Sequence, residues 1–192
     1  MAAPNPYLES FRELFPDKPS WEHVEKLGPG KVRRIREDFC RRYSWAIPND
    51  HALECIAKYA PIVEMGAGAG YWAHLLQERG VDVSAFDAHS RVSNENWLSP
   101  AVGSSEQLEK FSHHSLFLCW PPLNDDMAAK CLEVFKGEYL IYVGEAAGGC
   151  TADDLFFEIL RQSYTLKERI QIPSWPGIDD SLWVYERAKA DF

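Results

Sequence analysis

The sequence of 192 residues lacks the marks of membrane and secreted chains. No apolar run approaches the roughly 18 residues that a membrane span needs, and the N-terminus has no basic start followed by a long apolar stretch. Cysteine is sparse and forms no C-x-x-C pair; the five cysteines are Cys40, Cys55, Cys119, Cys131 and Cys150. We therefore expect no disulfide framework and no metal site, and we expect a cytoplasmic protein.

Positive charge is also in short supply. The chain has 20 Lys and Arg against 29 Asp and Glu, which gives a net charge of −9. A nucleic-acid-binding surface is usually basic, so a nucleic-acid partner is not expected. The exception is segment 31–42, KVRRIREDFCRR, which carries six basic and two acidic side chains. We interpret it as the solvated face of a helix, and docking of an anionic partner is the alternative.

Apolar and aromatic side chains, in contrast, are plentiful. The sequence is 46% hydrophobic and contains 7 Trp, 8 Tyr and 10 Phe, enough for one domain with a sizeable core. The pattern changes near Pro61. Segment 1–60 is helical in character, with Asn5 and Pro6 typical of a helix start, and we expect it to pack as an extension on a core formed by 61–192.

After Pro61, short apolar runs alternate with helical stretches. We expect strands at 61–66, 81–86, 115–120, 139–144, 165–172 and 181–188, and helices at 71–79, 125–135 and 151–163. Thr151 and Asp154 resemble a capping box for the last helix. Segment 88–114 has the weakest pattern, with a short strand near 101–103 and a short helix near 106–111. The alternation predicts parallel βαβ units and a doubly wound, mostly parallel α/β sheet.

A glycine-rich turn between the first strand and the next helix carries the functional prediction. Gly66, Gly68 and Gly70 allow a sharp turn and leave no Cβ between chain and ligand. The helix start adds free N–H groups and partial positive charge. Asp87 ends the second strand, and the carboxyl ends of adjacent parallel strands lie side by side, so its carboxylate can accept both hydroxyls of a ribose. These features indicate a nucleoside with an anionic tail; an ordinary tight turn with a surface Asp, or another nucleotide, are the alternatives.

The spacing of the glycines separates two cofactor classes. The dinucleotide pattern G-x-G-x-x-G would need glycine at Tyr71, which disfavours an NAD(P)-dependent oxidoreductase. The pattern present is E-x-G-x-G-x-G, and it resembles the first motif of the Rossmann-like (class I) methyltransferases that use S-adenosylmethionine. The resemblance implies a seven-stranded sheet of order 3-2-1-4-5-7-6 with the last strand antiparallel. The cofactor-binding residues that it implies are Glu64, Gly66, Ala67, Gly68, Gly70 and Asp87.

Within that resemblance, the individual residues have different roles. The glycine loop faces the methionine part of the cofactor, Glu64 supports the loop and the amino group, and Asp87 holds the ribose. A carboxylate at Glu64 also suits the cationic sulfonium and ammonium on electrostatic grounds.

The segment FLCWPPL, 117–123, falls where the fourth strand of that superfamily ends beside the transferable methyl. Methyltransferases that act on amino groups carry Asn/Asp/Ser-Pro-Pro-aromatic at this place. Here Trp120 replaces the polar residue and Leu123 the aromatic one, which argues against amino-group methylation. Trp120, Pro121 and Pro122 could form a wall of the acceptor pocket, or a core tryptophan followed by a stiff turn.

Glu145 ends the fifth predicted strand and could orient an acceptor or act as a base; a helix cap or a solvated carboxylate is the alternative. Trp175 could cover the same pocket or only the sheet edge. Segment 45–50, by its place before the core, could close over the methionine end of the cofactor.

Taken together, WAIPND, VEMGAGAGYWA, LFLCWPP, GGCTADD and WPGIDD resemble small predicted methyltransferases of unassigned substrate. We therefore expect methyl transfer from S-adenosylmethionine to a small-molecule or protein acceptor. The alternative of the same fold is a non-catalytic module that binds the cofactor or a partner.

Overall fold

A computed structural model describes residues 4–17, 19–89 and 97–189. Its centre is a seven-stranded sheet in the order β3-β2-β1-β4-β5-β7-β6. The strands are β1 Ile62–Met65, β2 Val83–Asp87, β3 Ala101–Val102, β4 Ser115–Cys119, β5 Tyr139–Gly144, β6 Tyr164–Gln171 and β7 Ser181–Arg187. β7 runs antiparallel to both of its neighbours, and the pairs among β1 to β5 are parallel. The doubly wound α/β prediction and the strand order implied by the resemblance are confirmed.

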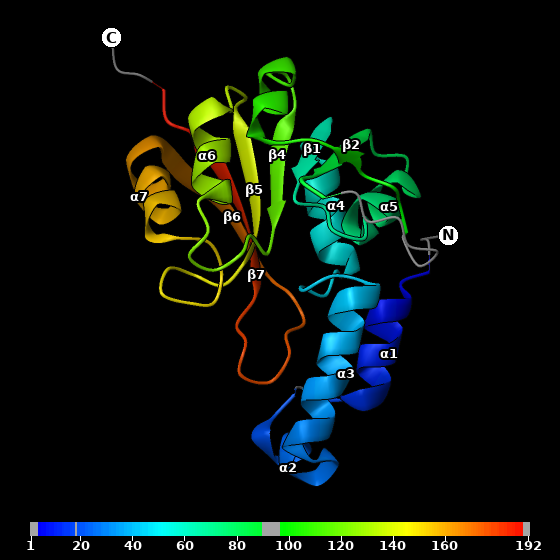
Figure 1. Cartoon of the computed structure of the whole chain (residues 1–192). Coiled ribbons are helices and arrows are strands. Elements are labelled where there is room, and N and C mark those ends of the chain that lie inside the picture. Colours follow the sequence, from blue (N-terminus) through cyan, green and yellow to red (C-terminus); the bar gives the residue numbers. More distant parts are fainter. Residues whose placement is uncertain (1–3, 18, 90–96, 190–192) are drawn as a thin grey trace.

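Helices cover both faces of this sheet (Figure 1). Those before β1 are α1 Pro6–Leu14, α2 Trp21–Leu27, α3 Pro29–Arg42 and α4 Asp50–Ala57, and those within the sheet region are α5 Tyr71–Gln77, α6 Met127–Val134, α7 Asp154–Ser163 and the 3-10 helix η1 Ser105–Lys110. Helices α4 and α5 pack on one face, and α6 and α7 on the other. None of the helices in the described ranges is long and apolar enough to cross a membrane.

Strand β1 shows why the first predicted strands are apolar at nearly every position. Ile62 packs into the core on the α5 face, whereas Val63 and Met65 pack into the core on the α6 face. Successive side chains of a strand point to opposite faces, and both faces of this sheet are covered by helices. A strand buried on both sides therefore needs apolar residues at nearly every position, and a polar residue within it is exceptional.

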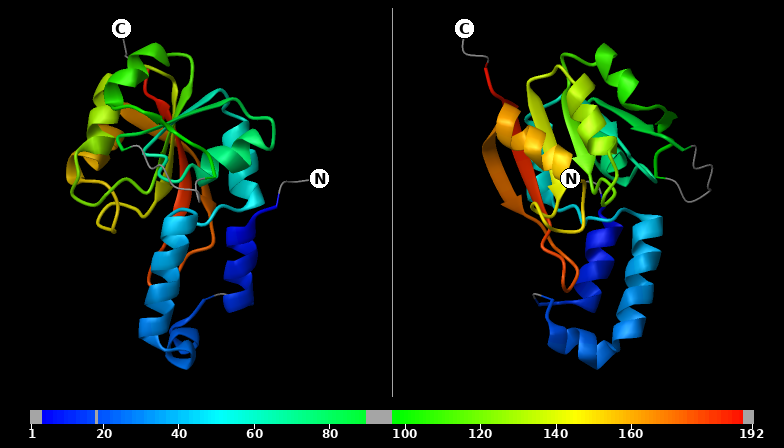
Figure 2. Two further views of the ribbon diagram at one scale, coloured as in Figure 1. Left: turned by 45° about the vertical axis from the view of Figure 1, so that its right-hand side comes forward. Right: turned by 60° about the vertical axis from the view of Figure 1, so that its left-hand side comes forward.

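Helices α1 to α3 extend past the carboxyl ends of the parallel strands, beside the β6–β7 loop (Figure 2). Asn5 caps α1 as expected, since its side chain accepts a hydrogen bond from the Leu8 N–H at 3.1 Å. From the β6–β7 loop, the buried Trp175 packs edge-on against Phe11 of α1 and Phe39 of α3. The helices before β1 and the sheet region thus share one apolar core.

One local prediction needs correction. The capping box at the start of α7 is wrong: Asp153 caps the helix by accepting from the Phe156 N–H at 2.9 Å, and Thr151 instead hydrogen bonds to Tyr142. The reason is the preceding turn, in which Ala152 has a left-handed φ of +57° and donates to the Pro121 carbonyl.

Of the weakly patterned segment 88–114, residues 90–96 lie outside the described ranges. The short strand expected near 101–103 is β3, and the helix expected near 106–111 is the 3-10 helix η1.

Candidate functional site

The candidate site lies at the carboxyl ends of β1, β2 and β4. The order of the strands reverses there: the chain continues from β1 to β2 on one side of β1, whereas β4 lies on its other side. In open α/β sheets, ligands bind at such a switch point. The glycine loop 66–70 spans it, linking β1 to α5.

The backbone of the loop is left-handed at each glycine. Gly66, Gly68 and Gly70 have φ of +75°, +58° and +74°, a region that residues with a Cβ rarely adopt. The loop folds back onto β2: the Gly66 and Ala67 N–H groups both donate to the Phe86 carbonyl, at 2.9 and 3.0 Å. The glycines therefore make the turn possible, and the turn brings the loop against the end of β2.

The surroundings of the three glycines differ. Among the described residues, no atom would lie within 4 Å of a Cβ at Gly68, so this glycine borders open space in that part of the chain. A Cβ at Gly66 would lie 2.7 Å from the Met127 side chain, and one at Gly70 would lie 2.6 Å from Leu98. The lack of a side chain at Gly66 and Gly70 thus also allows Met127 and Leu98 to pack against them. Gly68 is the glycine whose missing side chain leaves room for a ligand.

Asp87 lies directly beside the loop. One carboxylate oxygen accepts from the Gly68 N–H at 2.8 Å, and the other accepts from the His89 N–H at 3.0 Å. An ionised carboxylate has about four acceptor positions, so each oxygen can still accept from one hydroxyl. The two backbone bonds fix the orientation of the carboxylate next to the open face of Gly68. Its role as ribose ligand stays a prediction.

Glu64 is the buried polar residue of β1, with 1% of its surface exposed. Among the described residues, its buried Oε2 atom has no hydrogen-bond partner. Burial, with a smaller contribution from the charge of Asp87, raises its pKa to about 8. A cation beside this carboxylate would supply the missing interaction. The ammonium and sulfonium of S-adenosylmethionine have that chemistry, so the residues present fit the cofactor.

At the end of β4, Trp120 makes an unusual turn. Its φ is +53°, in the left-handed region that a bulky residue seldom occupies. Its indole N–H donates to Asp180 at 2.7 Å, and the Pro121 carbonyl accepts from the Ala152 N–H at 2.9 Å. Pro121 is buried and Pro122 is exposed. These contacts place the predicted Trp-Pro-Pro wall at the carboxyl edge of the sheet, and its contact with an acceptor stays a prediction.

Asp180 is a candidate site residue that the sequence analysis missed. It precedes β7 and is 1% exposed. Burial raises its pKa to about 7, against the lowering effect of the Trp120 hydrogen bond. The acidic doublet of Asp179 and Asp180 directly before an antiparallel strand was the available signal. Such a strand begins at the edge where the parallel strands end.

Glu145 joins two loops. Its carboxylate accepts from the Cys150 N–H at 2.8 Å and from the Asp179 N–H at 3.0 Å. This arrangement holds the β5–α7 loop and the β6–β7 loop together beside Asp180. A role in orienting an acceptor is untested. Trp175, the other candidate for the acceptor pocket, points into the aromatic core instead and donates its indole N–H to Tyr7.

Segment 45–50 packs over the end of β4, and its closure over the methionine end of the cofactor stays a prediction. The Trp45 ring stacks on the Trp120 ring, with centroids 5.2 Å apart. The Arg36 guanidinium lies 5.6 Å from the first centroid and 5.5 Å from the second. Arg36 therefore turns inward from the basic segment 31–42, and partner docking on that segment stays a prediction.

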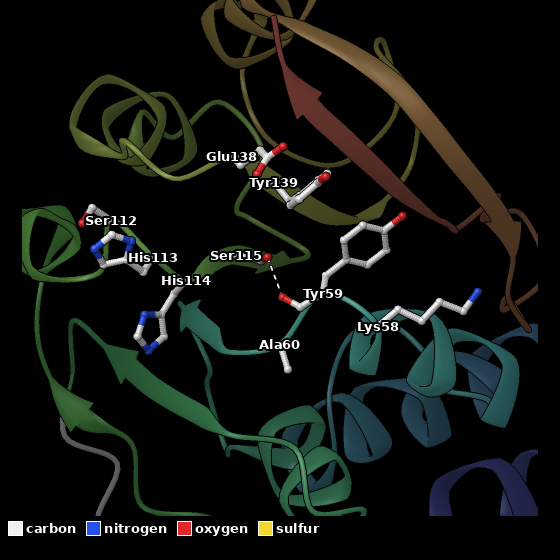
Figure 3. A pocket seen from close by; sticks show the side chains of 9 residues that line it. All are labelled: Lys58, Tyr59, Ala60, Ser112, His113, His114, Ser115, Glu138 and Tyr139. Carbon is white, nitrogen blue, oxygen red and sulfur yellow. Dashed lines mark hydrogen bonds between the residues drawn. The ribbon is translucent and has the colours of Figure 1, made fainter. Parts of the chain in front are cut away.

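A separate hollow of about 370 Å³ lies at the amino ends of β1, β4 and β5, on the opposite edge of the sheet. Figure 3 shows that the side chains of His113 and His114 diverge and that Lys58 points away from them. Its polar groups do not converge on one point, and ligands of such folds bind at the other edge. Within the described ranges, no three His, Cys, Asp or Glu side chains are placed to hold a metal ion.

The sequence matches no family model and no curated protein. Among solved structures, the chain is similar to a TehB-like SAM-dependent methyltransferase from Corynebacterium glutamicum (TM-score 0.50, 15% identity, 84% of this chain and 100% of that one). It is also similar to the CcbJ methyltransferase from Streptomyces caelestis (TM-score 0.49, 15% identity, 71% and 94% of the two chains). Together with the strand order, the first of these similarities shows that the chain has the Rossmann-like fold of S-adenosylmethionine-dependent methyltransferases.

Proposed function

We propose that the protein is an S-adenosylmethionine-dependent methyltransferase. The observation that carries this proposal is the buried Glu64 carboxylate, two residues before the glycine loop, with an oxygen that has no hydrogen-bond partner in the part of the chain that the structure describes. A buried carboxylate without a partner is unfavourable, and a cationic ligand beside it removes the penalty. The name of the TehB-like protein from Corynebacterium glutamicum, a SAM-dependent methyltransferase, supports the same cofactor here.

Different residues of the site interact with different parts of the cofactor. Gly68 leaves space for it, Asp87 accepts from the ribose hydroxyls, and Glu64 offsets the positive charge of the methionine part. Gly66, Ala67 and Gly70 shape the loop. The bound cofactor supplies an activated methyl group, so the chain contributes mainly proximity and orientation of the acceptor.

The acceptor is a small molecule or a protein, and its place is beside Trp120, Pro121, Pro122 and Glu145. These residues follow β4 and β5, which lie one and two strands away from β1 and its glycine loop. The acidic net charge of −9 disfavours a nucleic-acid acceptor.

Calorimetric titration with S-adenosylmethionine, S-adenosylhomocysteine and NAD⁺ tests the cofactor assignment. We expect binding of the first two and none of the third. Tighter binding of NAD⁺ would favour an oxidoreductase instead. Transfer of a labelled methyl group into fractionated lysate then separates an enzyme from a module that binds the cofactor without catalysis, because only the enzyme labels a fraction.

A further inference from the structure

Two opposite charges flank the stacked rings of Trp45 and Trp120. Asp180 accepts the Trp120 indole N–H from one side, and the Arg36 guanidinium lies near both rings. They reach this place from distant parts of the chain, since α3 and the β6–β7 loop lie side by side at the carboxyl edge of the sheet (Figures 1 and 2). Among the described residues, Arg36 and Asp180 form no ion pair with each other or with another side chain.

Arg36 differs from the other arginines of its helix. Arg33, Arg41 and Arg42 are exposed and pair along α3 with Glu37 or Asp38. The Nε atom of Arg36 is buried and has no hydrogen-bond partner within residues 4–17, 19–89 and 97–189. A guanidinium has five N–H donors and matches a carboxylate through two parallel hydrogen bonds. A buried donor left unpaired is unfavourable, so the position of Arg36 favours an anionic group brought by a ligand.

Asp180 is held at the strand next to the proposed cofactor site. Glu64 lies on β1, and β1 pairs with β4, where Phe117 is its partner. Trp120 directly follows β4, and its indole N–H donates to the Asp180 carboxylate at 2.7 Å. Asp180 is therefore held at the carboxyl end of β4, a place suited to a proton acceptor for the transfer.

We propose that Asp180 and Arg36 form the acceptor subsite, and that the acceptor is a small molecule with both an amino group and a carboxylate. This inference rests on the proposed function and names the substrate class. The carboxylate binds Arg36, and the amino group faces Asp180. Asp180 supplies, through the β6–β7 loop, the polar group that is missing at position 120 of the Trp-Pro-Pro motif.

The chemistry balances with these two residues. The acceptor ammonium gives one proton to Asp180, which frees the nitrogen lone pair. The nitrogen then forms a bond to the methyl carbon while the methyl–sulfur bond breaks, and its electron pair remains on sulfur. The products are the methylated ammonium and the uncharged thioether.

The test uses the full chain and three matched probes: L-phenylalanine, phenethylamine, which lacks the carboxylate, and 3-phenylpropionate, which lacks the amine. The aromatic ring suits the partly exposed Trp45. Affinities are measured by calorimetry, with and without saturating S-adenosylhomocysteine. We expect L-phenylalanine to bind at least tenfold more tightly than either analogue.

Variants assign the effect to the two residues. Arg36→Met and Asp180→Asn should each lower the affinity for L-phenylalanine at least tenfold. Arg36→Lys and Asp180→Glu keep the charge and should retain measurable binding. The matched controls Arg33→Met and Asp179→Asn alter exposed neighbours and should change the affinity less than twofold.

The proposal is overturned if L-phenylalanine does not bind, if it binds no better than the analogues, or if Arg36→Met and Asp180→Asn bind it normally. Lower thermal stability of these variants with an unchanged probe affinity would mean a structural role, and would also overturn it. If S-adenosylhomocysteine fails to bind while L-phenylalanine still binds through Arg36 and Asp180, then the proposed function fails and the subsite remains.

Discussion

Glu64 gives the candidate site its dependence on pH. In the free protein at pH 7, a pKa of about 8 keeps this side chain mostly protonated. A bound cation favours the carboxylate, so binding of S-adenosylmethionine should release close to one proton at pH 7. Affinity should accordingly rise as the pH increases towards 8 and level off above it.

Calorimetry in two buffers of different ionisation enthalpy measures this release. Glu64→Gln should release none, and it should bind with an affinity that does not change over the same pH range. Proton release from the variant equal to that of the wild type would assign the titration to another group.

Asp87 should contribute to the affinity for S-adenosylmethionine through hydrogen bonds to its carboxylate. Asp87→Ala should weaken binding of S-adenosylmethionine by about 1.5–3 kcal/mol, or about 10- to 150-fold. The side chain also holds the Gly68 N–H, so part of the loss comes from the loop. Asp82→Ala, which changes an exposed residue before the same strand, is the control and should bind normally. Unchanged affinity in a folded Asp87→Ala protein would refute the ribose assignment.

Gly68 and Gly80 form a matched pair. Both have a left-handed φ, +58° and +77°, and no atom of the described residues would lie within 4 Å of a Cβ at either position. Substitution by Val should therefore strain the backbone at both positions by about 1–2 kcal/mol. Gly68→Val should in addition abolish cofactor binding, because its side chain fills the open space beside Asp87. Thermal melts of the two variants measure the loss of stability, and calorimetric titrations measure their affinity for S-adenosylmethionine. An equal loss of affinity in Gly68→Val and Gly80→Val would contradict a ligand site at Gly68.

At the scale of elements, the sequence was most informative where local rules determine structure. Asn5 begins α1, and the apolar runs after Pro61 form buried strands, because capping and burial on both sheet faces depend on neighbouring residues. The helix cap of α7 was misassigned by two residues, since the turn before it is held by Pro121 from another segment.

The sequence predicted the part of the candidate site that depends on neighbouring elements of the chain. The glycine loop and Asp87 lie on consecutive elements of one βαβ unit, so their proximity follows from the order of the elements. The hydrogen bonds of Trp120 to Asp180 and of Trp175 to Tyr7 join residues 60 and 168 positions apart. Which loop turns inward depends on such tertiary contacts, and no local pattern specifies them.

The β6–β7 loop and the helices before β1 stabilise each other through Trp175. This side chain is 2% exposed and contacts α1 and α3. Trp175→Ala should lower the free energy of unfolding by about 3–5 kcal/mol. Trp21→Ala, at a tryptophan that is 67% exposed, should change it by less than about 0.5 kcal/mol. Urea denaturation followed by circular dichroism measures both. A small effect at Trp175 would mean that the helices before β1 are only loosely attached.

At the scale of the whole molecule, the buried carboxylates should make the free protein less stable as the pH rises. Burial raises the pKa of Asp180 from 3.8 to about 7 and that of Glu64 from 4.5 to about 8. The folded state therefore binds more protons than the unfolded state between pH 4 and 8, and stability falls with pH across that window. The upper limit is about 4–5 kcal/mol for each group.

Urea midpoints measured from pH 4 to 9 test this. The double variant Glu64→Gln, Asp180→Asn should have a flatter profile than the wild type, and saturating S-adenosylmethionine should flatten that of the wild type by stabilising ionised Glu64. A wild-type profile that rises through this range would show that other groups dominate.

The contact between Trp175 and the first helix has a consequence for how the chain is made. Trp175 is synthesised 168 positions after Tyr7, the residue to which it donates its indole N–H. Until Trp175 has emerged from the ribosome, Tyr7 and Phe11 lack the indole that covers them in the folded protein. The aromatic core between α1 and the β6–β7 loop is therefore completed late in folding, after the strands and helices encoded between them have been made.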